Sequence, residues 1–332
     1  MSTDTITPEE IGIDFSKHPC FSRDAHHKFG RIHLPVAPRC NIQCNFCNRK
    51  FDCMNESRPG VTSAILKPWQ AVDYLDEMLA KRPEIAVLGI AGPGDPFANS
   101  NETMETLRLA RARHPGLILC LASNGLGIVP YIDELAELKT SHVTITINAL
   151  DPTIGAEIYA WVRENKTPLR GLHGAALLLE RQLEAIRKLK EKNIVVKTNT
   201  IIIPGINDEH IPTLAKHLQE LGVDIMNCMP LIPVKGAAFE DMTEPDRTMV
   251  ARRHRRSARR VQSPWRRRRL YRAPAARYGG ALKFCLDESS GSDRSGRAEW
   301  RQFRAGLAEL LRRFAAAVLR PADRRGWFLS CW

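Results

Sequence analysis

The sequence lacks a hydrophobic run long enough to cross a membrane, and it lacks the start of a secretory signal. None of the apolar stretches in its 332 residues reaches the roughly 18 residues that a membrane span needs. Residues 1–4 read Met-Ser-Thr-Asp, without the basic region and apolar segment of a signal peptide. We therefore expect a cytoplasmic protein with no membrane partner. In that reducing compartment the nine cysteines favour metal or redox chemistry over disulfides.

Acidic residues and lysine are scarce in residues 247–332. This segment carries 23 basic and 6 acidic side chains, and all of its basic residues except Lys283 are arginine. Residues 1–246 carry 26 basic and 31 acidic side chains, so the whole chain's net charge of +12 comes from the tail. The charge therefore gives no reason to expect a nucleic-acid partner for residues 1–246. We expect the Arg-rich tail to be largely disordered, because its charges repel one another and its sparse apolar residues bury little surface.

Two explanations of the Arg-rich tail stay open. Lysine and arginine solvate a surface almost equally well, so the near-absence of lysine favours a change of reading frame in a GC-rich gene. A genuine nucleic-acid-binding tail is the alternative. Apolar residues at helical spacing between Trp300 and Val318 also allow a short helix that docks elsewhere.

Three cysteines lie within eight residues, as Cys40, Cys44 and Cys47 of the stretch CNIQCNFC. Thiolate is the soft ligand that iron–sulfur clusters need, and three thiolates can hold three irons of a cubane while the fourth iron stays open. A structural zinc site is the alternative. Such a site needs a closed set of four nitrogen or sulfur ligands, and no second compact pair of cysteines or histidines follows at zinc-finger spacing. The motif therefore favours a four-iron cluster with a reactive iron.

Short β-branched runs alternate with amphipathic helical stretches from residue 31 onward, which is typical of repeated βα units. We predict strands at 31–36, 84–91, 116–122, 142–148, 194–203 and 223–228. We predict helices at about 67–81, 101–113, 129–138, 175–192 and 208–220. The fold class is then α/β: an irregular arm (1–30), a partial (βα)6 barrel (31–246) and the Arg-rich tail (247–332). In such barrels chemistry gathers at the C-terminal ends of the strands.

Several residues of types that bind ligands lie on the predicted strands or just after them. Gly92 and Gly94 lie after the second strand, where glycine lets the backbone approach a ligand, although a tight turn explains them as well. Asn124 and Asn148 lie at the ends of the third and fourth strands, where polar side chains either bind a ligand or satisfy one another. Cys120, on the third strand, is by itself an ordinary core residue.

Together these features resemble the radical S-adenosylmethionine (SAM) superfamily, whose CxxxCxxC loop follows the first barrel strand. Residues 18–21 (HPCF), 26–27 (HH), 35–53 and 55–60 (NESRPG) resemble more closely the NifB family of nitrogenase iron–molybdenum cofactor assembly proteins. The resemblance covers about residues 15–246, which is the second half of the arm and the predicted barrel.

The resemblance implies roles for single residues. The implied ligands of the SAM-binding cluster are Cys40, Cys44 and Cys47. The implied SAM-binding residues are Gly92, Gly94 and Asp95 for the amino group, Asn124 and Asn148 for the ribose and carboxylate, and Phe46 for the adenine. Cys20 and Cys53 are implied ligands of a second cluster, and Cys120 is an implied ligand or acceptor in the cavity. Glu56 is a candidate proton-handling residue, with an exposed salt bridge as the alternative.

The resemblance also implies a function. It is the fusion of two four-iron clusters and the insertion of a SAM-derived carbide, which gives the eight-iron precursor of the iron–molybdenum cofactor. The implied cofactors are a [4Fe-4S] cluster with SAM at its open iron, and one or two further [4Fe-4S] clusters as substrates. The implied partners are an electron donor, an iron–sulfur donor and the carrier or scaffold proteins of nitrogenase assembly. Another radical SAM maturase and a non-catalytic iron–sulfur carrier are the alternatives.

The chain departs from the NifB family after residue 246. The family carries a paired-cysteine motif there that holds the second substrate cluster, whereas residues 247–332 contain no CxxC and only Cys285 and Cys331. Water, histidine and carboxylate are poorer ligands for a soft iron–sulfur site. We therefore expect this chain to bind and cleave SAM but to complete carbide-cluster synthesis poorly.

Overall fold

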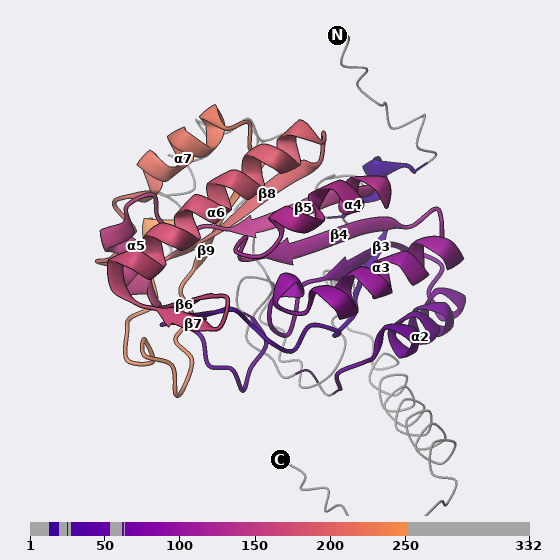
Figure 1. The fold of residues 1–332 in the computed structure, drawn as a ribbon, viewed down its shortest axis with the longest axis horizontal. Helices are drawn as coiled ribbons and strands as arrows, with labels where there is room; N and C mark the ends of the chain where they lie inside the picture. Colours follow the sequence, from indigo (N-terminus) through magenta and orange to yellow (C-terminus); the bar gives the residue numbers. More distant parts are fainter. Residues whose placement is uncertain are drawn as a thin grey trace, which may run out of the picture. The chain divides into compact units, whose positions relative to one another are not determined.

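A parallel sheet forms the centre of the computed structural model, which describes residues 13–19, 25, 28–53, 62, 64–246 and 248–250 (Figure 1). Within these residues the sheet has six strands, each parallel to its neighbours. In spatial order they are β1 (Gly30–His33), β3 (Ile85–Ile90), β4 (Ile118–Ser123), β5 (Thr140–Thr146), β8 (Val195–Ile202) and β9 (Ile225–Pro230). All the strands predicted from the sequence are confirmed, with ends that differ by a few residues.

The connections between the strands carry the helices, which lie along one side of the sheet (Figure 1). They are α2 (Pro68–Lys81), α3 (Ser100–Arg113), α4 (Ile132–Glu137), α5 (Pro152–Ile158), α6 (Gly171–Glu191) and α7 (Ile211–Glu220). The short 3₁₀ segments are η1 (Phe15–Lys17), η2 (Pro96–Ala98) and η3 (Val129–Tyr131). The five predicted helices are confirmed, whereas α5 is an addition. This arrangement is the predicted α/β partial barrel.

Local sequence signals explain where these helices begin. At α2, Pro68 occupies the first turn, where its missing N–H is not needed. The backbone N–H of Lys67 donates to the side-chain oxygen of Gln70 (3.0 Å), which closes that first turn. At α5, the side chain of Asp151 accepts from the N–H of Thr153 (2.8 Å). Among the described helices, none is long and apolar enough to cross a membrane.

A small antiparallel sheet, which the sequence did not predict, holds the cysteine motif. Its strands are β2 (Ile42–Cys44), β6 (Tyr159–Glu164) and β7 (Thr167–Leu169), in the order β2-β6-β7. The hairpin between β6 and β7 turns at Asn165, whose φ of 53° is the left-handed conformation that asparagine tolerates. Since β2 has only three residues, its strand character depends on pairing with β6 and not on a local pattern.

The described part of the N-terminal arm packs against the main sheet. Asp14 caps η1 by accepting from the N–H of Ser16 (3.0 Å). Ile13 and Phe15 then pack with Val87 of β3 and Ile118 of β4. The Arg-rich tail lies outside the described residues except for residues 248–250, and its predicted disorder stays a prediction.

Candidate metal centre

The cysteines of the motif lie in a loop that follows β1 and includes β2. The pairing of β2 with β6 places Cys44 opposite Tyr159. The N–H of Cys47 donates to the carbonyl oxygen of Cys44 (3.0 Å). The side-chain amide of Gln43 donates to the carbonyl oxygens of Cys44 (3.0 Å) and Cys47 (2.7 Å). The conformation of the loop therefore rests on hydrogen bonds that the protein itself supplies.

The thiols of the motif are close enough to affect one another's ionisation. Burial raises the pKa of Cys44 well above its ordinary value, and the thiols of Cys47, Cys40 and Cys53 raise it further. Burial raises the pKa of Cys40 to about 11, the Asp95 carboxylate adds to this rise, and the Arg49 guanidinium opposes it. Burial raises the pKa of Cys47, again against Arg49. Thiolates in this place need additional positive charge, which iron supplies when it binds.

The three sulfur donors of the motif are the ligands that a cubane needs. In a cubane each thiolate binds a different iron, and three cysteines leave the fourth iron open. Cys40, Cys44 and Cys47 are not joined in disulfides, and Cys40 and Cys47 are partly exposed. These residues fit a [4Fe-4S] cluster.

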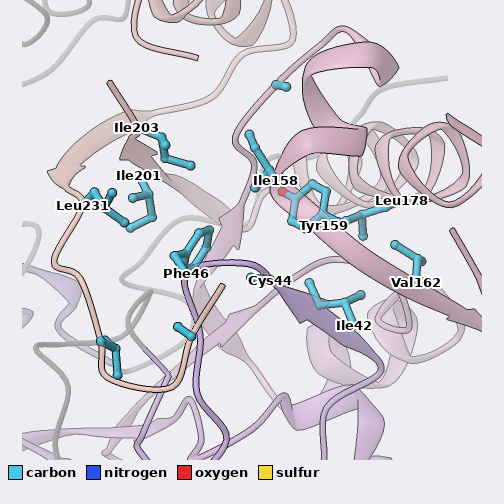
Figure 2. Packing of buried hydrophobic residues seen from close by; sticks show 13 residues of the cluster. Ile42, Cys44, Phe46, Ile158, Tyr159, Val162, Leu178, Ile201, Ile203 and Leu231 are labelled. Carbon is cyan, nitrogen blue, oxygen red and sulfur yellow. The ribbon is translucent and has the colours of Figure 1, made fainter. Parts of the chain in front are cut away.

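An apolar cluster encloses the buried side of the cysteine loop (Figure 2). Cys44 and Phe46 pack there with side chains of β6, β8 and the segment after β9, among them Tyr159, Ile201 and Leu231. Phe46 is only 1% exposed, so protein side chains already cover its ring. Stacking of Phe46 on adenine remains a prediction, and the ring's observed contribution is to anchor the loop.

The glycine-rich stretch after β3 is joined to the cysteine loop through the backbone. The N–H of Gly94 donates to the carbonyl oxygen of Ala37 (2.7 Å), and the N–H of Ala37 donates to that of Gly92 (3.4 Å). The N–H of Asp95 donates to the carbonyl oxygen of Arg39 (2.8 Å). A Cβ atom at Gly94 would collide with that Arg39 oxygen, so this approach requires glycine. The two loops form one hydrogen-bonded unit.

Asp95 occupies the centre of a buried hydrogen-bond network. Its residue is 3% exposed, and its carboxylate accepts from the N–H of Phe97 (2.9 Å), the N–H of Asn124 (2.6 Å) and the hydroxyl of Ser123 (3.0 Å). Burial raises the pKa of Asp95, while these hydrogen bonds oppose the rise. Donors of the protein therefore occupy the carboxylate that the sequence motif assigns to SAM.

Asn124 connects β4 to the cysteine loop. Its Nδ2 donates to Oδ1 of Asn41 (2.6 Å) and to Sγ of Cys40 (3.8 Å). From α6, the buried amide of Gln182 donates to the carbonyl oxygens of Asn124 (3.0 Å) and Thr146 (2.8 Å). The sequence reading missed Gln182. Its signal was a lone polar residue within the buried apolar stripe of α6.

Asn148 follows β5 and is completely buried. Its Oδ1 accepts from the N–H of Ile201 (2.8 Å), and its Nδ2 donates to the hydroxyl of Tyr159 (3.1 Å). The side-chain amide of Asn207 donates to the backbone carbonyl oxygen of Asn148 (3.0 Å). Both side-chain polar atoms of Asn148 are thus used within the protein. Its role toward SAM stays a prediction, and its observed role is to join β5 to β6 and β8.

Cys120 lies on the sheet face that the N-terminal arm covers, where it packs with Ile13 and Val87. It is 6% exposed and stands in register with His142 of β5. The rings of His18 and His142 lie 4.4 Å apart between centroids. Burial lowers the pKa of His18 well below its ordinary value, and His142, Arg31 and Lys197 lower it further. A buried thiol and two buried imidazoles therefore form one enclosed region, and two partly exposed cations act on it.

The structure describes only one of the remaining predicted site residues. Cys53 is partly exposed, and its thiol is near enough to Cys44 to raise the pKa of that group. This places Cys53 beside the compact motif. Cys20 lies outside the described residues, as does Glu56 with the rest of 54–61, so their roles stay predictions.

The sequence matches the radical SAM superfamily over residues 34–218, which is more than half of the chain. The chain belongs to this superfamily. The matched segment includes the cysteine motif, the glycine-rich stretch and the network around Asp95, so the geometry described above falls inside the part that defines the superfamily. A [4Fe-4S] cluster and SAM are the groups that this membership implies.

Two curated relatives show which radical SAM proteins this chain is similar to. The FeMo cofactor biosynthesis protein NifB of Chlorobaculum tepidum is 57% identical over 238 residues, which cover 72% of this chain and 56% of that protein. NifB of Klebsiella pneumoniae is 48% identical over 243 residues, covering 72% and 52%. The similarity to NifB that the sequence motifs predicted is confirmed. The chain spans about half the length of these relatives.

A solved structure supports the fold. The crystal structure of Streptococcus suis SuiB bound to precursor peptide SuiA superposes with a TM-score of 0.51 at 16% sequence identity. The superposition covers 69% of this chain and 45% of that one. At this identity the likeness concerns the half-barrel alone.

Proposed function

We propose that this radical SAM protein acts in the biosynthesis of the nitrogenase iron–molybdenum cofactor, with a [4Fe-4S] cluster held by Cys40, Cys44 and Cys47. The observation that supports this most is the loop in which the thiol of Cys44 lies near those of Cys40 and Cys47. When bound, the cluster supplies the electron that breaks a carbon–sulfur bond of SAM and yields a deoxyadenosyl radical. Cys40, Cys44 and Cys47 would hold the cluster and would leave one iron free for SAM.

The residues of the chain contribute position and exclusion of water. The β2–β6 pairing and the Gln43 amide hold the cysteine loop, and Phe46 seals its buried side. Gly94 lets the loop after β3 approach the cysteine loop closely. A fixed, largely dry site keeps a reactive radical away from water and side reactions.

We propose that two four-iron clusters are the substrates, which are fused into an eight-iron product with a carbide from a SAM methyl group. Cys53, beside the motif, and Cys120, in the enclosed region, supply thiolates for a substrate cluster together with Cys20. Iron–sulfur clusters with thiolate ligands carry negative charge. Arg31 and Lys197, which act electrostatically on that region, supply the opposite sign.

The partners in this proposal are those of the assembly process. They are an electron donor, a protein that delivers iron–sulfur clusters, and a carrier or scaffold that receives the product. Thiolate-held clusters require reduced cysteines, and we therefore place the reaction in a reducing compartment such as the cytoplasm. The absence of a CxxC pair from residues 247–332 supports a narrower activity, in which SAM is cleaved but the eight-iron product forms poorly.

Two assays test the proposal. Reduced, anaerobically reconstituted protein should release deoxyadenosine from SAM, which a non-catalytic iron–sulfur carrier would not do. Added four-iron cluster should then raise SAM consumption, because the first methyl transfer needs a cluster sulfur as acceptor. Deoxyadenosine release that ignores added cluster but responds to a peptide substrate would favour another radical SAM maturase and contradict the nitrogenase assignment.

A further inference from the structure

We propose that Asp95 is a positioning residue for the cysteine loop and does not bind the amino group of SAM. In this assignment Asp95 holds Asn124, and the side-chain amide of Asn124 donates a hydrogen bond to the thiolate of Cys40. The proposal rests on the cluster site of the proposed function and specifies how the protein controls that cluster.

The first support is that protein donors use the acceptor capacity of the Asp95 carboxylate. An ionised carboxylate offers about four lone-pair sites on its two oxygens. The N–H of Phe97 donates to Oδ1, the N–H of Asn124 donates to Oδ2, and the Ser123 hydroxyl lies 3.0 Å from Oδ2 and 3.3 Å from Oδ1. A SAM ammonium group that displaced one of the backbone donors would leave a buried N–H unpaired, which is unfavourable.

The second support is the direct path from Asp95 to the cluster ligand. Asp95 accepts from the backbone of Asn124, and the side chain of the same asparagine reaches Asn41 (2.6 Å) and the sulfur of Cys40 (3.8 Å). A short chain of hydrogen bonds therefore connects the loop after β3 to the first cysteine of the motif. Loss of Asp95 would release Asn124 and alter this donor.

The third support is a parallel connection from the same loop. The side chain of Asn99, which is 1% exposed, donates to the carbonyl oxygens of Arg39 (2.8 Å) and Asp95 (2.8 Å) and accepts from the N–H of Arg39 (3.2 Å). Arg39 immediately precedes Cys40. The loop that carries Asp95 thus holds the cysteine from the backbone side as well as from the thiol side.

The chemical consequence concerns the reduction potential of the cluster. A hydrogen bond to a ligand sulfur stabilises the reduced cluster, which carries the more negative charge, and so raises the potential. Removal of the Asn124 amide should move the potential to more negative values. A cluster that is harder to reduce delivers its electron to SAM less readily at a given donor potential.

The test compares Asp95→Asn and Asn124→Ala with wild type in reconstituted full-length protein without SAM. The matched control is Asp151→Asn, because Asp151 caps α5 through an equivalent side-chain bond to a backbone N–H. A redox titration followed by EPR should show a negative shift for Asn124→Ala and no shift for the control. Asp95→Asn also removes a negative charge that acts on Cys40, which by itself raises the potential, so the positioning role of Asp95 is measured by hydrogen exchange.

A second measurement keeps the test independent of cluster loading and of catalysis. In cluster-free protein, amide hydrogen exchange of residues 39–41 and 123–126 should be faster in Asp95→Asn than in wild type, and unchanged in the Asp151→Asn control. Ser123→Ala, a milder change, should show the same direction if Asp95→Asn fails to fold. Wild-type protein that releases no deoxyadenosine would contradict the proposed function without affecting this exchange result.

The contrary outcome is equally definite. Under the SAM-ligand interpretation, Asp95→Asn weakens SAM binding but leaves the hydrogen exchange of residues 39–41 and 123–126 in cluster-free protein as in wild type. That result would overturn the proposal and return Asp95 to the SAM site.

Discussion

Replacement of Asn148 by alanine separates a structural role from a SAM-binding role. In the native state Asn148 accepts from the N–H of Ile201 and donates to the hydroxyl of Tyr159, with no exposed surface of its own. Without the amide, the buried N–H of Ile201 loses its partner, at a cost of about 1–3 kcal/mol, and the Tyr159 bond adds roughly 1 kcal/mol. We expect the free energy of unfolding to fall by about 2–4 kcal/mol.

Chemical denaturation of cluster-free protein under anaerobic conditions measures this change. The midpoint should move to lower denaturant with an unchanged m-value, which is the signature of altered stability. Asn101→Ala is the matched control, because Asn101 is exposed on α3, and its effect should stay within about 0.5 kcal/mol. An Asn148→Ala variant of unchanged stability that binds SAM much more weakly would refute the reasoning and support the ligand role.

Three further predictions follow from the loops, the outlying cysteines and the tail. Gly94→Ala should lower the iron content after reconstitution, because the added Cβ would displace the Arg39 carbonyl next to Cys40. The control Gly116→Ala, with open space around its Cβ, should retain full iron content. Joint replacement of Cys20 and Cys53 by alanine should reduce bound iron while SAM still binds, and unchanged iron would return both residues to structural roles. The 332-residue chain, supplied with excess four-iron cluster, reductant and SAM, should activate cofactor-free nitrogenase poorly; efficient activation would show that the missing cysteine pair is replaceable.

The main sheet was predictable because each of its strands carries its own signal. Buried parallel strands are rich in β-branched residues, as in residues 195–202 and 140–146, and the amphipathic helices between them have a clear period. The cysteine motif is also a local feature of the sequence, because three thiols within eight residues must lie close together whatever the fold. The CxxxCxxC loop after the first strand was therefore readable from the sequence.

The small sheet and the buried polar network were not predictable in the same way. The strand character of residues 42–44 depends on pairing with β6, more than a hundred positions later, and three residues carry no period. The connection of Asp95 to Asn124, and the donation from Gln182, join segments far apart in the chain. From residue type alone, a ligand-binding aspartate or asparagine cannot be distinguished from one that is buried as a structural anchor.

The EPR spectrum of the reduced cluster, recorded with and without SAM, tests the central claim most directly. Wild-type protein should show a four-iron signal that changes when SAM is added, because SAM occupies the open iron. Single alanine variants of Cys40, Cys44 and Cys47 should lose that response together with deoxyadenosine formation. A variant lacking all three cysteines that still shows the SAM-responsive signal would contradict the account.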